Sequence, residues 1–330
     1  MQTTTPRTTG EDASARLMSP FMGRPPSNVA YATAWGRMLH GKSDEILGDG
    51  SLARFEGKVN LIFTSPPFPL NRKKRYGNET GESYIRWLCT FGPLFKKMLT
   101  PDGSIVIEMG NSWEPGSPVM STLALRALLK FQSKNDLHLC QEFIWQNPAK
   151  LPSPAQWVNV ERIRVKDSFT KLWWLSPNEK PKASNQRVLQ EYSKSMKDLL
   201  KKGSYNAGKR PSEHDIGETS FLKNNGGAIP SNVLTYANTL ASDAYQTYCR
   251  ENQFQLHPAR MPSDLAKFFI KFLTEPGDIV LDPFGGSNTT GCAAEDLERF
   301  WISIEASEEY IKGSRGRFGD GITLDSFSVS

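Results

Sequence analysis

Short apolar segments that favour β-structure alternate with amphipathic segments along most of this chain. Val59–Thr64 is apolar and is followed by two prolines, so it is expected to form a short buried strand. Ser83–Leu99 carries apolar residues near helical spacing: Ile85, Leu88, Phe91, Leu94, Phe95 and Met98. Strands that alternate with helices build a mostly parallel sheet covered on both faces. We therefore predict an α/β fold with a doubly wound, mostly parallel sheet.

The same alternation continues on both sides of a basic middle region. Before it we expect a turn at Thr100–Ser104, strands at Ser104–Met109, Leu139–Trp145 and Lys171–Leu175, and a helix at Leu123–Lys130. After it we expect helices at Ser263–Leu273 and Asn288–Leu297, and strands at Ile279–Leu281 and Phe300–Ile304. These elements are sufficient for one large α/β domain.

The positive charge of the chain lies in its middle. Residues 150–223 hold 15 Lys and Arg against 8 Asp and Glu, whereas the remainder holds 25 against 27. Such a distribution suggests that a polyanion docks there, although a solvated lysine-rich surface is an equal alternative. Residues 176–227 are broken by Pro and Gly around one expected helix, Val188–Leu200. Lys194 and Lys197 lie at helical spacing in it and are candidate contacts to a DNA backbone.

Composition makes several other classes of protein unlikely candidates. No apolar run approaches the roughly 20 residues that a membrane helix needs, and the first residues lack the apolar core of a secretory signal. The four cysteines lie far apart without a CxxC pair, so we predict neither a metal site nor a disulfide framework. A reducing cytoplasm fits this pattern best.

A glycine-rich stretch, LDPFGGSNTTG, joins an expected strand to an expected helix. Its candidate cofactor contacts are Asp282, Pro283, Phe284, Gly285, Gly286, Ser287, Asn288 and Thr289. Glycines allow close approach of backbone to a ligand, and a helix N-terminus offers free N–H groups. Glu305 ends the next strand, where an acid in a doubly wound sheet accepts hydrogen bonds from ribose hydroxyls.

The same stretch narrows the choice of cofactor. It lacks the GxGxxG of a dinucleotide site, and Cys292 and Ala293 stand where a P-loop requires Lys and Ser or Thr. A cofactor with ribose hydroxyls and no phosphate remains, and S-adenosylmethionine fits. A strand–helix corner without any ligand is the alternative.

The stretch TSPPF ends the strand Val59–Thr64. Ser65 and Pro66 offer a hydroxyl and a carbonyl oxygen as acceptors for the two N–H bonds of a planar amino group, and Pro67 stiffens the loop. Phe68 offers a face on which a base can stack. A base inside a duplex cannot reach such a pocket unless it is flipped out. The basic run that follows can hold phosphates beside it: Arg72, Lys73, Lys74 and Arg75. By itself, such a stretch is more often a common proline turn.

Together the motifs resemble those of DNA amino-methyltransferases that use S-adenosylmethionine. TSPPF resembles the N4-cytosine form of the catalytic motif, and LDPFGGSNTTG resembles the cofactor loop. FQLHPARMP, Phe254–Pro262, resembles the segment before the helix that closes over the methionine end. The order of the motifs is that of the circularly permuted β class of restriction–modification enzymes. The resemblance runs from Tyr31 to Tyr310.

This resemblance implies methylation of the N4 atom of a flipped-out cytosine in double-stranded DNA, which protects the site from a cognate endonuclease. It further implies the inner cytosine of CAGCTG as target, and cofactor contacts by His257, Pro258, Lys42 and Ser43. Composition and the order of the motifs together divide the chain into a flexible arm (1–29), a catalytic half (30–175), a target-recognition insert (176–227) and a cofactor-binding half (228–330). We expect a monomer in a bacterial cytoplasm.

Two alternatives stay open: an N6-adenine enzyme of the same permuted class, in which Asp or Asn more often replaces Ser65, and a DNA-binding protein without catalysis. None of the cysteines follows a proline, which disfavours a C5-cytosine enzyme. Glu108 ends the next expected strand and could reach the active site or simply cap that strand. Asn288 stands where the family usually has glycine; asparagine tolerates a left-handed backbone, and its side chain could contact the cofactor.

Overall fold

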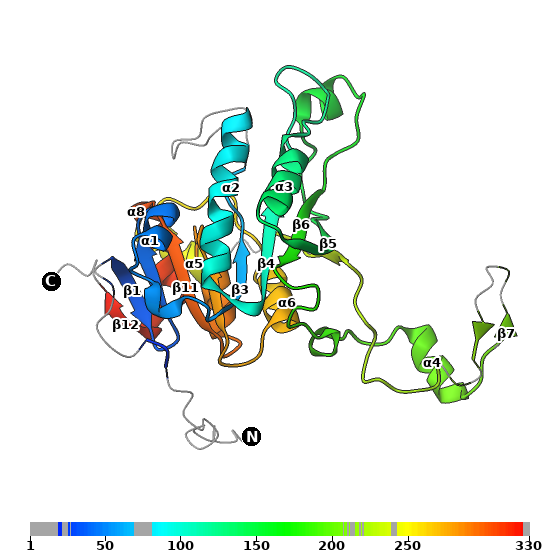
Figure 1. Cartoon of the computed structure of the whole chain (residues 1–330). Helices are drawn as coiled ribbons and strands as arrows, with labels where there is room; N and C mark the ends of the chain where they lie inside the picture. Colours follow the sequence, from blue (N-terminus) through cyan, green and yellow to red (C-terminus); the bar gives the residue numbers. More distant parts are fainter. Residues whose placement is uncertain are drawn as a thin grey trace, which may run out of the picture.

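The computed structural model describes residues 19–21, 26, 28–68, 81–206, 208, 209, 211, 215–217, 219, 221–238 and 243–325. Within them, ten strands form one sheet in the order β12-β1-β2-β11-β10-β3-β4-β6-β5-β9, and β7 pairs with β8 apart from it (Figure 1). The strands are β1 Val29–Thr33, β2 Gly36–His40, β3 Val59–Thr64, β4 Leu99–Met109, β5 His138–Gln146, β6 Phe169–Ser176, β7 Gly208–Lys209, β8 Asp215–Ile216, β9 Val233–Thr235, β10 Ile279–Asp282, β11 Phe300–Glu305 and β12 Ile322–Asp325. The central strands β2, β11, β10, β3 and β4 are parallel.

Helices cover both faces of this sheet. The described helices are α1 Ser43–Gly48, α2 Gly81–Met98, α3 Leu123–Lys134, α4 Lys194–Lys202, α5 Ala244–Glu251, α6 Ser263–Leu273, α7 Thr289–Glu295 and α8 Glu308–Ser314, of which α4 buries no residue and lies away from the sheet. One buried cluster joins the sheet to α1, α2 and α3, and a second joins it to α6, α7 and α8. Consecutive residues of β10 point to opposite faces of the sheet: Val280 belongs to the second cluster and Leu281 to the first. The doubly wound α/β prediction is confirmed.

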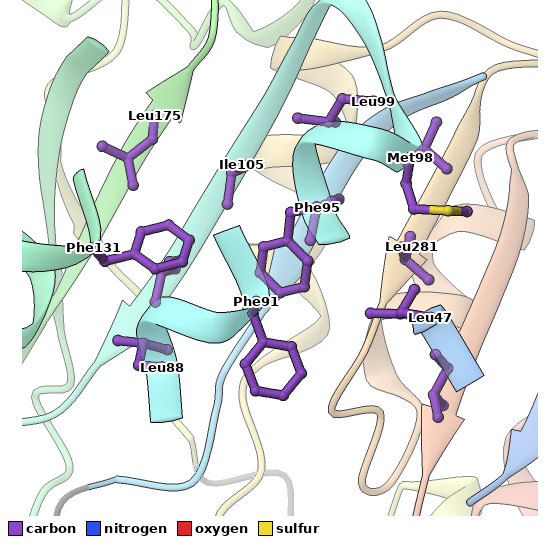
Figure 2. Packing of buried hydrophobic residues seen from close by; sticks show 14 of the residues in the cluster. Leu47, Leu88, Phe91, Phe95, Met98, Leu99, Ile105, Phe131, Leu175 and Leu281 are labelled. Carbon is purple, nitrogen blue, oxygen red and sulfur yellow. The ribbon is translucent and has the colours of Figure 1, made fainter. Parts of the chain in front are cut away.

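Helix α2 packs on the sheet through the apolar stripe seen in the sequence. Figure 2 shows Phe91 and Phe95 of this helix in the cluster that also holds Ile105 of β4 and Leu281 of β10. The rings of Phe95 and Phe131 of α3 are 6.2 Å apart. Fully burying an aromatic or leucine side chain stabilises a fold by ~1.5–3 kcal/mol, so this stripe holds α2 firmly in place.

Two regions differ in kind from the sequence predictions, whereas the other elements differ from them by at most four residues at either end. Strand β4 begins at Leu99, because Leu99 pairs with Val59 before Ser104 pairs with Leu61, and the expected turn is a bulge between these pairs. The helix expected at Val188–Leu200 is instead a 3₁₀ turn, Asn185–Val188, followed by α4. The hydroxyl of Ser193 accepts from the backbone N–H of Met196 at 3.2 Å, which starts α4 after an extended stretch.

Most of the expected N-terminal arm, 1–29, lies outside the described residues. Phe21 is described, and only 5% of it is exposed. Its ring lies 5.4 Å from that of Phe55 and 6.0 Å from that of Phe300. This part of the arm therefore packs on the first cluster, which holds both rings.

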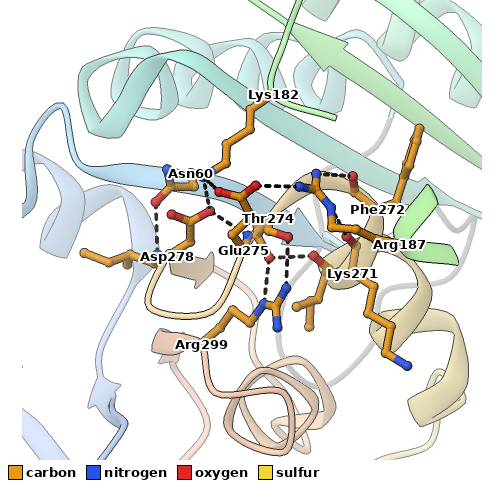
Figure 3. Close-up of polar contacts among 11 residues, drawn as sticks. Asn60, Lys182, Arg187, Lys271, Phe272, Thr274, Glu275, Asp278 and Arg299 are labelled. Atoms are coloured by element: carbon orange, nitrogen blue, oxygen red, sulfur yellow. Dashed lines mark hydrogen bonds and ion pairs between the residues drawn. The ribbon is translucent and has the colours of Figure 1, made fainter. Parts of the chain in front are cut away.

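Residues 189–228, which we call the extension, project from one side of the body (Figure 1). Strand β6 runs antiparallel to β4, so the chain after Ser176 leaves the sheet at the edge where the parallel strands begin. Polar contacts fasten it there (Figure 3): Lys182 pairs with Asp278 at 2.7 Å, and Arg187 pairs with Glu275 at 2.9 Å. The extension carries α4 at the edge of the sheet opposite the carboxyl ends of β3 and β10.

Candidate active site

The two motif loops meet because their strands are neighbours. β3 and β10 are adjacent and parallel, with Leu61 beside Val280, so TSPPF and the glycine loop leave the sheet at the same edge. Asp282 links the two loops. Its carboxylate accepts from the Thr64 hydroxyl at 2.8 Å, from the Thr290 hydroxyl at 2.7 Å and from the backbone N–H of Phe284 at 3.1 Å. Burial raises the pKa of Asp282 although all three hydrogen bonds lower it.

A cavity of about 670 Å³ opens between these loops. Most of the residues proposed from the sequence line it, from both halves of the chain: Lys42, Ser43, Ser65, Pro66, Pro67, Phe68, His257, Asp282, Pro283, Phe284, Gly285, Gly286, Ser287, Thr289 and Glu305. More than 200 positions separate Ser65 from Phe284 in the sequence. Their common cavity is therefore a product of the sheet order.

Glu108 holds the hydroxyl of Ser65. It is the last residue but one of β4, next to β3, and only 5% of it is exposed. Burial raises the pKa of Glu108 to about 7, while the hydrogen bond with Ser65 and the charge of Lys150 lower it. A buried carboxyl with a pKa near neutrality, in contact with the proposed catalytic hydroxyl, is typical of an active site.

The ring of Phe68 lies next to Gly110. A Cβ atom at Gly110, directly after β4, would lie 2.9 Å from Cε2 of Phe68, which is closer than real contacts allow. The absence of a side chain at Gly110 therefore leaves room for the ring at the end of the strand. Phe68 is half-buried and also lines the cavity.

The glycine loop wraps around the carboxylate of Glu305. The backbone N–H of Gly286 donates to Oε2 of Glu305 at 2.8 Å, and the N–H of Ser307 donates to Oε1 at 2.8 Å. Burial raises the pKa of Glu305. Gly286 has φ +50°, and a Cβ atom there would lie 3.1 Å from Nε2 of His257. A third backbone N–H, that of Ala306, also lowers the pKa of Glu305, and the carboxylate keeps acceptor capacity for a ligand hydroxyl, so the loop fits a ribose-bearing cofactor.

Three of the lining residues also make contacts within the protein. The hydroxyl of Ser43 donates to the carbonyl of Pro283, which ties α1 to the glycine loop. The ammonium of Lys42 pairs with Glu45 at 2.9 Å. His257 rests edge-on against the ring of Tyr310, with centroids 4.5 Å apart.

Asn288 faces the protein interior instead of the cavity. It adopts φ 54°, as the sequence suggested, and its side chain caps α7 by accepting from the N–H of Gly291 at 3.2 Å. Its amide donates to the hydroxyl of Tyr31 at 2.9 Å and accepts from that of Ser303 at 2.7 Å. Asn288 is 0% exposed, and its hydrogen bonds join β1, β11 and α7. Because Asn288 does not line the cavity, its placement does not support the predicted contact with the cofactor.

Other predicted contacts also lie away from the cavity lining. Pro258 is not among the residues that line it. Lys194 and Lys197 stand on α4 in the extension, so the structure does not bring them to the catalytic loops. The basic run Arg72–Arg75 lies outside the described residues. Over the part of the chain that is described, no group of three or more His, Cys, Asp or Glu could hold a metal, and no helix is long and apolar enough to span a bilayer.

The sequence did not identify an aromatic wall. Tyr84, Trp87 and Phe91 of α2 line the cavity, and the ring of Phe284 lies 5.6 Å from Trp87 and 5.2 Å from Phe91. Their spacing is that of an ordinary core stripe, so periodicity alone could not separate a cavity wall from buried packing. The order of the strands was the missing information.

Comparisons with known proteins agree with this geometry. The sequence model described as DNA methylase matches residues 59–315. The chain is 43% identical over 293 residues to the type II methyltransferase M.PvuII of Proteus hauseri, covering 88% of this chain and 86% of the relative. The solved structure of PvuII DNA methyltransferase (cytosine-N4-specific) matches with a TM-score of 0.70 and 37% identity over 92% of this chain and 91% of that one.

A more distant structure shows only the shared fold. A putative DNA modification methylase from Thermus thermophilus, complexed with S-adenosyl-L-methionine, matches with a TM-score of 0.50 and 19% identity, over 86% of this chain and 95% of that one. The family match covers both motif loops and the strands that carry them. The chain belongs to the DNA methylase family.

Proposed function

We propose that this chain transfers a methyl group from S-adenosylmethionine to the exocyclic N4 atom of a cytosine flipped out of double-stranded DNA. The observation that carries the proposal is the single cavity shared by Ser65–Phe68 and Phe284–Ser287. A catalytic loop of the N4-cytosine type and a cofactor loop must face one another for direct transfer. The similarity to an enzyme described as cytosine-N4-specific supports the same reaction.

The cofactor would lie against the glycine loop. Glu305 would accept from its ribose hydroxyls, with the glycine backbone packed closely beside it. Phe284, packed against Trp87 and Phe91, offers an apolar face at the same place. When bound, S-adenosylmethionine supplies an electrophilic methyl group on a positively charged sulfur.

The residues of the catalytic loop would prepare the target amine. The hydroxyl oxygen of Ser65 and the carbonyl oxygen of Pro66 would accept hydrogen bonds from the two N–H groups of the amine. This arrangement favours a pyramidal nitrogen with a free lone pair. Ser65 donates its own proton to the carboxylate of Glu108, so its oxygen is oriented to accept. Phe68 holds the cytosine ring by stacking.

Glu108 would also respond to the charge on the nitrogen. Positive charge develops on N4 as the new bond forms, and a nearby carboxylate stabilises it. A carboxyl with a pKa near 7 can then take up a proton from the product. The hydroxyl of Ser65 would lie between N4 and Glu108 and can relay this proton.

Analysis of methylated nucleosides tests the proposal. Duplex DNA that contains CAGCTG is incubated with labelled S-adenosylmethionine, hydrolysed to nucleosides and examined by mass spectrometry. The expected product is N4-methyldeoxycytidine, and its amount should fall strongly for Ser65→Ala. N6-methyladenine would favour the adenine alternative, and unlabelled DNA would favour a DNA-binding protein without catalysis.

The proposal extends to the setting of the protein. A type II methyltransferase is the modifying partner of a restriction system, so we place this chain on DNA in a bacterial cytoplasm, acting as a monomer. Light scattering on the purified chain, alone and with a short duplex, tests the stoichiometry. A mass of twice the chain would contradict it.

A further inference from the structure

The segment between β5 and β6, residues 147–168, exposes several large aliphatic side chains. The exposed fractions of Leu151, Val160, Ile163 and Val165 range from 60% to 88%. A single exposed aliphatic residue is ordinary, but a group of them within one short segment marks a contact surface.

This segment has a fixed shape. Asp167 pairs with Lys150 at 3.5 Å and accepts from the amide of Asn111 at 2.9 Å. The guanidinium of Arg164 lies 3.4 Å from the centre of the Trp113 ring. Contacts to the loop after β4 therefore hold one side of the segment, while its aliphatic side chains are exposed to solvent.

The segment stands at the catalytic edge of the sheet. β6 begins beside the end of β4, where Lys171 pairs with Met109, directly after Glu108. Lys150 is close enough to lower the pKa of Glu108. Figure 1 shows the segment at the end of the molecule where α2 begins, whereas the extension leaves from the other end.

The chemistry of the surface fits a nucleic acid. Exposed Arg162 and Lys166 stand among the aliphatic side chains. Arginine is common in protein–protein interfaces, but lysine is depleted there. DNA combines phosphates with apolar base faces, and proteins that open a duplex insert aliphatic wedges between base steps.

We propose that residues 147–168 form a wedge that enters the base stack beside the target cytosine. Leu151 and Val165, the most exposed of the group, occupy the stack, and Arg162 and Lys166 bind the flanking phosphates. Extrusion of a base leaves a gap in the stack, and an apolar wedge offsets the cost of opening it. The inference rests on the proposed function, because only an enzyme that flips its base needs the gap filled.

The test compares two DNA substrates. In one duplex the target cytosine is paired with guanine, and in the other it faces an abasic site, so that extrusion costs less. The double variant Leu151→Ser/Val165→Ser should lose roughly 10-fold or more in kcat/KM on the paired duplex. It should stay near wild type on the abasic duplex, with an unchanged melting temperature because both side chains are exposed. Leu129→Ser is the matched control, since Leu129 is 56% exposed on α3, outside the segment.

Equal losses on both duplexes, or none on either, would overturn the wedge. So would sedimentation showing that the double variant only abolishes self-association of the wild-type chain, which would identify the surface as a contact between proteins. If the wild-type chain labelled neither duplex, the proposed function itself would fail, and the wedge with it. If the double variant shows no selective loss on the paired duplex while the wild-type chain methylates both duplexes, the wedge is refuted and the proposed function stands.

Discussion

Replacing Glu108 by glutamine should stabilise the protein at alkaline pH while it slows methyl transfer. Burial raises the pKa of this carboxyl from its ordinary 4.5 to about 7. The folded state therefore binds more protons than the unfolded state between these two values, and stability falls as pH rises through the window. A pKa difference of this size corresponds to roughly 3 kcal/mol. The penalty is absent below about pH 4.5 and complete above about pH 7.

The assay is urea denaturation of both proteins at several pH values from 4.5 to 9. The free energy of unfolding of Glu108→Gln, relative to wild type, should increase by roughly 3 kcal/mol from the acidic to the alkaline end. Glu179→Gln, at an exposed position, controls for the loss of one surface charge. A relative stability that stays constant with pH would refute the assigned burial penalty.

Turnover should change in the opposite direction. Glutamine can still accept from Ser65 but cannot stabilise positive charge or take a proton, so kcat should fall roughly 100-fold at pH 8. The wild-type rate should rise with pH through about 7 as Glu108 ionises, and this inflection should disappear in the variant. A wild-type profile that falls across this range would show that the protonated acid is the active form.

Other substitutions separate the roles of the two loops. Ser65→Ala should lower kcat by about 10²–10³ with little change in cofactor Kd measured by calorimetry, and parallel loss of both would count against the role given to the hydroxyl. Phe68→Ala should weaken binding of the flipped base by ~1–3 kcal/mol in fluorescence titrations with a base analogue, a view that unchanged fluorescence would refute. Gly286→Ala should weaken cofactor binding roughly tenfold, because the methyl group would lie 3.1 Å from Nε2 of His257 in a left-handed backbone; an unaltered Kd would show that the loop can adjust.

The sequence was sufficient for the central fold because the signals there are local. Val59–Thr64 is apolar and ends in proline, and β3 has these bounds in the structure. The helix predicted at Ser263–Leu273 has these bounds, although Pro262 is its N-cap and no side chain caps it, and the strand predicted at Phe300–Ile304 extends by one residue to Glu305. The meeting of Ser65 with Phe284 could be inferred only from motif resemblance, since local patterns do not state that β3 lies beside β10.

Long-range geometry explains what the sequence could not supply. Contact of Lys194 and Lys197 with DNA stays a prediction, but their distance from the catalytic loops could not be foreseen, because it follows from the antiparallel direction of β6. Asn288 was read as a cofactor contact from its place in the loop. Its amide turns inward because the hydroxyls of Tyr31 and Ser303 offer buried partners from distant strands. Such partners have no signature near residue 288.

The extension has a narrow neck. Gln190 and Ala228 exchange two backbone hydrogen bonds, each 2.9 Å long, so the outgoing and returning chains are clamped side by side. Because this pair fixes both ends of the extension relative to the body, the segment between Gln190 and Ala228 can change in length and sequence without moving those ends. Evolution, or an engineer, could exchange this module between relatives by cutting at one pair of residues, leaving the catalytic edge of the sheet untouched.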